Sequence, residues 1–237
     1  MIADVDQRRD QIAANLTQVR ERIAAACGDV GRDPGGVTLV VVTKFFPASD
    51  VRLLAELGVT DIGENRHQEA EAKVAECRDV DLRWHFVGGL QSNKAAAVAS
   101  YADVVESVDR RKLVRRLDEG AHGRSHPVDC LIQVSIDEPD AEGRSGASPD
   151  DVPALAEAIE AASGLRLRGL MAVAPLGVDP RGPYGRLSEI HTDFVSSRPE
   201  ATWLSAGMSS DLEEAIRAGA THVRIGTAIL GSRPQVK

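Results

Sequence analysis

Residues 37–46 read VTLVVVTKFF, in which an apolar run is followed by a lysine, and this stretch indicates the fold of the chain. The segment from Val37 to Val42 is rich in β-branched side chains, as expected of a parallel strand covered on both faces. A charge at the tip of such a strand, on Lys44, is costly to bury unless the ammonium is paired or neutral. The run predicts a buried strand and leaves two roles open for Lys44, a side chain that reaches solvent or a reactive amine.

Short apolar runs alternate with helical stretches from this strand onward. The predicted strands lie at residues 37–43, 59–65, 82–88, 102–108, 128–136, 165–173, 202–206 and 221–227. Strands that alternate with helices predict an α/β fold with a parallel sheet, and eight such units favour a closed (β/α)8 TIM-type barrel. The alternative is a doubly wound open sheet, but no GxGxxG motif opens the first helix of the repeat.

An extra N-terminal helix precedes the repeat. Ile12, Leu16, Val19 and Ile23 recur at steps of four, three and four residues, which gives one apolar stripe. The segment GRDPGG at 31–36 ends this helix. The chain of 237 residues matches the size of one barrel, so we predict a single domain over 1–237.

Charge and composition narrow the classes of partner. A net charge of −8 argues against nucleic acid and against an anionic membrane, since both call for a basic surface. No apolar stretch approaches the roughly 20 residues that span a bilayer, and the N-terminus is charged where a signal peptide carries its apolar core. The three cysteines form no CxxC pair, which disfavours a disulfide framework or a zinc site. We therefore expect a cytoplasmic protein, and the lack of an apolar surface stripe favours a monomer.

Polar residues stand at the carboxyl ends of most predicted strands, where the chemistry of such barrels collects. They are Lys44, Glu64, Asn65, His85, Ser107, Ser135, Ser205 and Arg224. One lysine, one arginine and several neutral hydrogen-bonding groups would thus converge on one mouth. We find no carboxylate pair spaced for glycoside hydrolysis and no Ser-His-Asp set, and the histidines and acids are too scattered to predict a metal site.

The last two strands are each followed by a turn suited to an anion. In SAGMSSDLEEAI (205–216), Ser209 or Ser210 is the expected N-cap of a helix with acids in its first turn. In VRIGTAILG (223–231), Gly226 and Thr227 occupy the same kind of position. Capping alone explains either turn, but barrels often bind phosphate with the loops after strands seven and eight. Two such turns side by side predict a phosphate site.

A lysine across the mouth from a phosphate site suits a Schiff base with a phosphorylated aldehyde. A nearby Arg224 and an apolar setting would lower the pKa of Lys44 and increase the fraction of neutral amine. Pyridoxal 5′-phosphate (PLP) fits this description, because its phosphate provides the anchor and its carbonyl provides the imine.

Six segments then resemble one known family in sequence and in order. They are VVVTKFFPASDV, IGENRHQEA, WHFVGGLQSNK, GLMAVAP, SAGMSSDLEEAI and VRIGTAILG. The chain is similar, from about residue 8 to residue 232, to the pyridoxal-phosphate homeostasis proteins, which resemble the N-terminal barrel of alanine racemase without its second domain.

The resemblance implies a role for each site residue. Lys44 would carry PLP as an internal aldimine, with Arg224 facing the pyridine nitrogen and Asn65 near the other edge of the ring. The phosphate would be held by Ser209, Gly226 and Thr227, with Ser210 contributing. An arginine does not readily give the ring nitrogen a proton, so the cofactor is a poor electron sink and carbanion chemistry is weak. The family is taken to store PLP and hand it over to apo PLP-dependent enzymes without established catalysis.

The chain departs from the family at two positions. Gly89 stands where the family usually has proline, and Arg144 stands where it often has a lysine. If that lysine is a second, transient acceptor of the cofactor, this chain cannot use it, because arginine forms no ordinary imine. The loops at 137–149 and 174–185 follow strands, and each is open to two interpretations, a variable surface loop or a lid.

Three other functions compete with the carrier. A two-base racemase needs a second acid or base opposite the lysine. Tyr101 is expected at the start of a strand, at the wrong end of the barrel, whereas Tyr184 is expected in a loop on the catalytic face. A Schiff-base aldolase acting on a phosphorylated sugar would also use lysine and phosphate loops, but it would retain no chromophore. A pure protein-interaction module would form no adduct on Lys44 at all.

Overall fold

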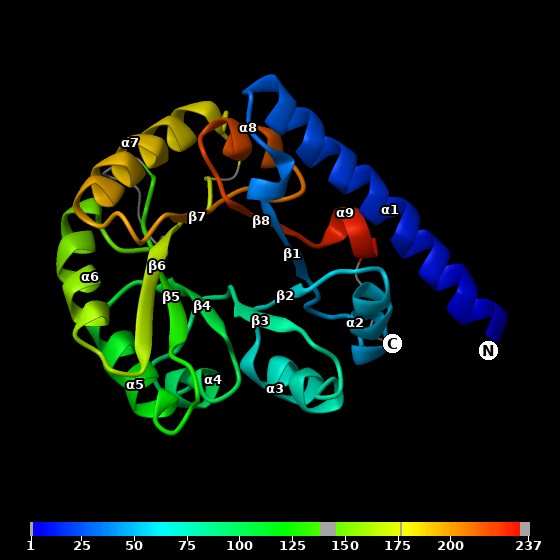
Figure 1. The fold of residues 1–237 in the computed structure, drawn as a ribbon, viewed down its shortest axis with the longest axis horizontal. Helices are drawn as coiled ribbons and strands as arrows, with labels where there is room; N and C mark the ends of the chain where they lie inside the picture. The colour runs from blue at the N-terminus through cyan, green and yellow to red at the C-terminus, as the bar shows by residue number, and fades with distance from the viewer. Residues whose placement is uncertain (1, 138–145, 176, 233–237) are drawn as a thin grey trace.

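Eight parallel strands close into a barrel in the computed structural model, which describes residues 2–137, 146–175 and 177–232 (Figure 1). The strands are β1 (Thr38–Val42), β2 (Asp61–Glu64), β3 (Arg83–Phe86), β4 (Val104–Val108), β5 (Val128–Gln133), β6 (Leu165–Met171), β7 (Trp203–Ser205) and β8 (His222–Ile225). Each strand pairs with the next in the chain, and β1 closes the barrel on β8 with Thr38 opposite His222. The predicted TIM-type barrel is confirmed.

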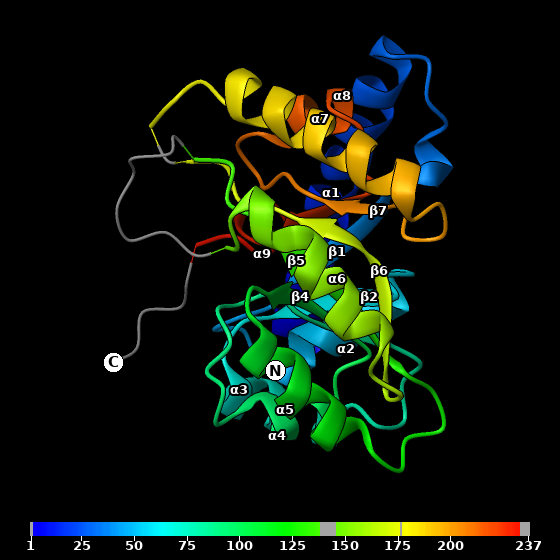
Figure 2. The same ribbon diagram turned by 90° about the vertical axis from the view of Figure 1, so that its left-hand side faces the viewer.

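Helices surround the strands on the outside. They are α1 (Ile2–Asp29), α2 (Ala48–Glu56), α3 (His67–Glu76), α4 (Ala95–Ala99), α5 (Arg111–Ala121), α6 (Val152–Glu160), α7 (Arg181–Ser197), α8 (Leu212–Arg217) and α9 (Thr227–Leu230). Figure 2 shows α6 and α7 lying against the outer side of the strands. Apolar side chains fill the layer between helices and strands, as Val41 of β1 and Leu54 of α2 illustrate with no exposed surface. No helix in the described part of the chain is long and apolar enough to cross a membrane.

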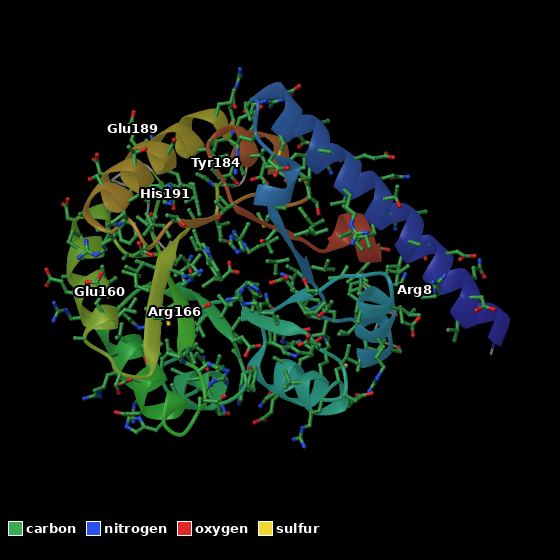
Figure 3. All side chains as sticks on the ribbon, viewed as in Figure 1. Arg8, Glu160, Arg166, Tyr184, Glu189 and His191 are labelled. Atoms are coloured by element: carbon green, nitrogen blue, oxygen red, sulfur yellow. The ribbon has the colours of Figure 1, made fainter. Side chains whose placement is uncertain are left out.

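The predicted N-terminal helix is α1, which lies across α8 and α9 (Figure 1). Its predicted apolar stripe is buried from Ile12 to Ile23. Arg22 donates to the carboxylate of Glu213 at 2.7 and 2.9 Å and to the carbonyl oxygen of Ser209 at 3.0 Å. Near the other end of the helix, Arg8, labelled in Figure 3, bonds the carboxylate of Asp50 and the carbonyl oxygen of Leu230. The helix thus holds the loops that follow β7 and β8.

Two local predictions were wrong. Asp211, rather than Ser209 or Ser210, is the N-cap residue of α8, and its Oδ1 accepts the Met208 N–H at 2.7 Å, which closes the preceding turn. The segment 174–185 is not a loop throughout, because α7 begins at Arg181. A proline in the first turn of a helix is tolerated, since its missing N–H has no intrahelical partner there. Tyr184 therefore lies in α7, and Arg144 lies outside the described residues.

Candidate functional site

A pocket of about 410 Å³ opens at the carboxyl ends of the strands. The seven residues predicted to bind a cofactor all line it, and they are Lys44, Asn65, Ser209, Ser210, Arg224, Gly226 and Thr227. They come from the ends of β1, β2, β7 and β8. A cavity of this volume, with a few polar groups among apolar walls, is of the size that holds one small molecule. The barrel therefore brings together residues that are up to 183 positions apart in the sequence (44 to 227).

Arg224 is fixed at the floor of the pocket by partners inside the barrel. Its side chain is 5% exposed, and Nη1 donates to Ser205 Oγ at 2.6 Å while Nη2 donates to the carbonyl oxygen of Ala172 at 2.8 Å. The Ser205 hydroxyl in turn donates to Glu106 Oε2 at 2.6 Å. These bonds fix the plane of the guanidinium, so its position does not depend on a ligand.

A buried chain of titratable groups continues below Arg224. His85 lies between Glu106, at 2.7 Å, and Asp61, at 2.9 Å. Burial by itself lowers the pKa of His85, but its hydrogen bonds to the two carboxylates outweigh burial and raise that pKa. Burial also acts to raise the pKa of Glu106, yet His85 and Arg224 hold it at about 2. Below Arg224, the acidic side chains of Glu106 and Asp61 thus alternate with the basic side chain of His85.

The loops predicted to bind phosphate meet at one side of the pocket. Ser209 Oγ accepts the N–H of Ala228 at 3.4 Å, which joins the turn after β7 to the first turn of α9. A Cβ atom on Gly226 would lie 3.0 Å from the carbonyl oxygen of Val42, so the backbone just after β8 approaches β1 closely enough that a side chain would require a shift. Hydroxyls and backbone N–H groups gather here, as an anion requires.

Asn65, the residue after β2, supplies a hydrogen-bond acceptor on the wall of the pocket. Its Oδ1 is buried and has no hydrogen-bond partner among the described residues. A Cβ on Gly88 would lie 2.5 Å from both Cβ and the carbonyl oxygen of Asn65, so glycine at that position lets the two loops touch. Buried polar atoms are rarely left unpaired, and this oxygen is therefore available to a donor on a bound molecule.

Several residues singled out in the sequence do not line this pocket. Tyr184, labelled on α7 in Figure 3, is 1% exposed and donates its hydroxyl to Asp211 Oδ2 at 2.7 Å. Tyr101 follows α4, and its ring stacks on His67. Glu64, His85, Ser107 and Ser205 are buried in the barrel behind the pocket. The described residues contain no group of three or more His, Cys, Asp or Glu side chains that could hold a metal ion.

Comparisons with known proteins agree with this geometry. The alanine racemase N-terminal domain family matches residues 8–234. The pyridoxal phosphate homeostasis protein of Pseudomonas aeruginosa is 41% identical over 222 residues, which cover 94% of this chain and 96% of that protein. The chain belongs to the family of pyridoxal phosphate homeostasis proteins. Its relative of the same name from Escherichia coli is 38% identical over 96% of this chain and 99% of its own length.

Solved structures place this homeostasis-family chain in the same fold. PipY of Synechococcus elongatus, determined with PLP bound, has a TM-score of 0.79 and 34% identity, and the match covers 93% of this chain and all of that one. An alanine racemase from Clostridium difficile has a TM-score of 0.71 at 14% identity and is matched over 58% of its length. That last similarity shows a shared fold only.

Proposed function

We propose that this protein binds PLP covalently through Lys44 and acts in the homeostasis of that cofactor. The observation that carries the proposal is that one pocket holds an amine, a fixed guanidinium, an unpaired amide oxygen and two loops rich in N–H and hydroxyl donors. PipY, a relative that covers the whole barrel, was determined with PLP bound, which supports the same ligand here.

The residues present fit the chemical groups of PLP. When bound, PLP supplies an aldehyde carbon that condenses with a primary amine. Lys44 is the lysine that lines the pocket, among its fourteen lining residues. Ser209, Ser210, Gly226 and Thr227 provide hydroxyls and backbone donors for the phosphate, and Asn65 provides an acceptor on the opposite wall.

Arg224 determines what kind of PLP protein this is. A guanidinium keeps its proton, so Arg224 would donate a hydrogen bond to the ring nitrogen of bound PLP without protonating it, and the ring would then be a poor acceptor of electrons. Tyr184, the remaining candidate for a second base, is buried and bonded to Asp211, and burial raises the pKa of its hydroxyl. Both features favour a carrier over a racemase.

The carrier role has consequences for partners. We propose that a single domain spanning residues 1–237 works as a cytoplasmic monomer, and that amines, including the active-site lysines of apo PLP-dependent enzymes, take the cofactor from Lys44. Release then needs an amine that reaches the open mouth of the pocket, where Val173 is 41% exposed.

The experiment that tests this function is a visible absorption spectrum of the purified protein, followed by borohydride reduction and peptide mass mapping. We expect a yellow protein whose reduced adduct maps to Lys44, and a Lys44→Ala variant that has lost the covalent chromophore. Lys94→Ala is the matched control, because Lys94 follows β3 at the same end of the barrel but does not line the pocket. A colourless protein that forms no adduct with added PLP would contradict the proposal.

A further inference from the structure

We propose that Glu69 and Lys73 of α3 are positioning residues for Lys44, because together they select the orientation of the peptide bond that joins Lys44 to Phe45. This inference deepens the proposed function and rests on it for the role of Lys44. Glu69 and Lys73 themselves lie outside the pocket lining, and the sequence alone predicts no role for either.

The lysine sits in a turn of unusual conformation. The Phe46 N–H donates to the carbonyl oxygen of Thr43 at 3.0 Å, so Lys44 and Phe45 are the two central residues of a four-residue turn. Phe45 has a φ of 71° and is the single non-glycine residue with positive φ in the described ranges. Since Lys44 keeps a negative φ, this is the pattern of a type II turn, which normally takes glycine at its third position.

Glu69 holds the strained side of this turn. Its Oε1 accepts a hydrogen bond from the backbone N–H of Phe45. Type I and type II turns differ by a flip of the central peptide, and here that peptide carries the Phe45 N–H. A flip would relieve the positive φ, but it would also turn the Lys44 carbonyl oxygen toward the Glu69 carboxylate. The carboxylate therefore selects the type II form.

Lys73 fixes Glu69 and the other side of the turn. Its Nζ donates to Glu69 Oε1 at 2.9 Å, to Glu64 Oε1 at 2.6 Å and to the carbonyl oxygen of Thr43 at 2.6 Å. These three acceptors match the three donors of the ammonium group, and Lys73 as a whole is only 4% exposed. Thr43 Oγ1 also donates to Glu64 Oε1 at 2.5 Å. The residues before and after Lys44 are thus both bound to one buried cluster.

The cluster explains why phenylalanine rather than glycine stands at the strained position. The Phe45 ring lines the pocket, and the Arg66 guanidinium lies 5.5 Å from its centroid. Phenylalanine at this position supplies a side chain that packs at the site. The ionic cluster stabilises the positive-φ backbone conformation that glycine would adopt without strain. Lys73, whose three donors are all engaged, is therefore a structural lysine and not a second amine for the cofactor.

The first measurement is amide hydrogen exchange of Phe45 in the protein freed of cofactor. We expect exchange about tenfold faster in Glu69→Ala and Lys73→Met than in the wild type, which is the size of a left-handed residue's strain. Glu69→Gln keeps a carbonyl acceptor and should retain most of the protection. Glu71→Ala is the matched control on the same helix, because the Glu71 side chain is 61% exposed and its carboxylate lies 4.0 Å from His67.

The second measurement is the rate at which each protein forms its Lys44 chromophore with added PLP. We expect about a tenfold slower rate in Glu69→Ala than in the wild type. In the Phe45→Gly background, adding Glu69→Ala should change the rate by less than about twofold, because glycine removes the strain. Unchanged exchange and an unchanged rate in Glu69→Ala and Lys73→Met would overturn the inference. A wild type that forms no Lys44 adduct, while Phe45 exchange still depends on Glu69, would refute the proposed function and leave the turn assignment standing.

Discussion

Glu106→Gln isolates the charge that supports the floor of the pocket. Glu106 has no exposed surface, and its two oxygens contact His85 at 2.7 Å and Ser205 at 2.6 Å, with Arg224 at 3.7 Å. Glutamine has the same shape and can still bond to both neighbours. The variant therefore removes the negative charge that faces Arg224 and leaves His85 with Asp61 as its one remaining carboxylate partner among the described residues.

The magnitude follows from the lowered pKa of Glu106 and from the strength of its charge pair with Arg224. Glu106 has a pKa of about 2 instead of 4.5, and a difference of roughly 2.5 pKa units corresponds to about 3 kcal/mol of unfolding free energy. A charge pair at 3.7 Å interacts by roughly 4 kcal/mol at an effective dielectric constant of about 20. Breaking a buried pair by removing one partner typically costs about 3–5 kcal/mol. We expect the variant to lose about 3 kcal/mol.

The loss depends on pH in two directions. The pKa of Glu106 is lowered by folding, so its contribution is present above about pH 4.5 and is lost as the pH falls toward 2. The pKa of His85 is raised, so its contribution is complete below about pH 6.5 and is lost as the pH rises through the folded value. The difference between wild type and variant should therefore be largest near pH 5–6.

Urea unfolding at pH 6, followed by circular dichroism and by tryptophan fluorescence, measures this difference. Glu119→Gln is the control, because Glu119 is 44% exposed and pairs with Arg116 at the surface, where the expected loss is below about 0.5 kcal/mol. A loss under about 1 kcal/mol for Glu106→Gln at pH 6, or a loss that stays constant down to pH 3, would refute the reasoning.

Three further predictions concern residues that lie behind the pocket. Gly88→Ala should cost about 2–3 kcal/mol in urea unfolding and weaken PLP binding, because the new Cβ meets Asn65 at 2.5 Å, whereas Gly89→Ala, with nothing within 4 Å, should stay within about 0.5 kcal/mol. Tyr184→Phe should lose about 1–2 kcal/mol and keep its full chromophore, and a lost chromophore would restore this tyrosine as a site residue. Arg22→Gln should weaken PLP binding about threefold in a fluorescence titration, since it frees the Ser209 carbonyl from α1; unchanged affinity would show that the phosphate loop is held without the helix.

The sequence predicted the barrel well because its strands carry a strong local signal. The run VTLVVVT is apolar on both faces, and VDCLIQV is apolar on one face. Each is followed by a helix, so the order of elements limits the topology to few solutions. The rule that function gathers at the carboxyl ends of barrel strands then selected Lys44, Asn65 and Arg224 without any contact information. All three line the pocket.

What the sequence could not show are the partners that fix those residues. Glu106 lies in the run VVESV and Lys73 lies on a helix, and nothing in the local pattern says that the first meets His85 and Ser205 or that the second meets Thr43. Such contacts depend on the closure of the barrel and have no sequence period. A charged residue within an apolar strand, as in VVESV, was the available signal, because a buried charge requires a partner.

The Arg224 side chain and the backbone turn at Lys44 are both held by buried hydrogen bonds, and this bears on how a carrier would release its cofactor. Arg224 is bonded to Ser205 and Ala172, and the turn of Lys44 is bonded to Glu69 and Lys73, so neither depends on a ligand for its position. A site that is already formed gains affinity, because little ordering is lost on binding, and it gives no conformational step that could drive release. We therefore expect release to depend on the concentration and reactivity of an attacking amine. The rate of chromophore loss should rise linearly with added primary amine and remain slow with a tertiary amine of equal basicity, and a rate that saturates at low amine concentration would instead indicate an opening step within the protein.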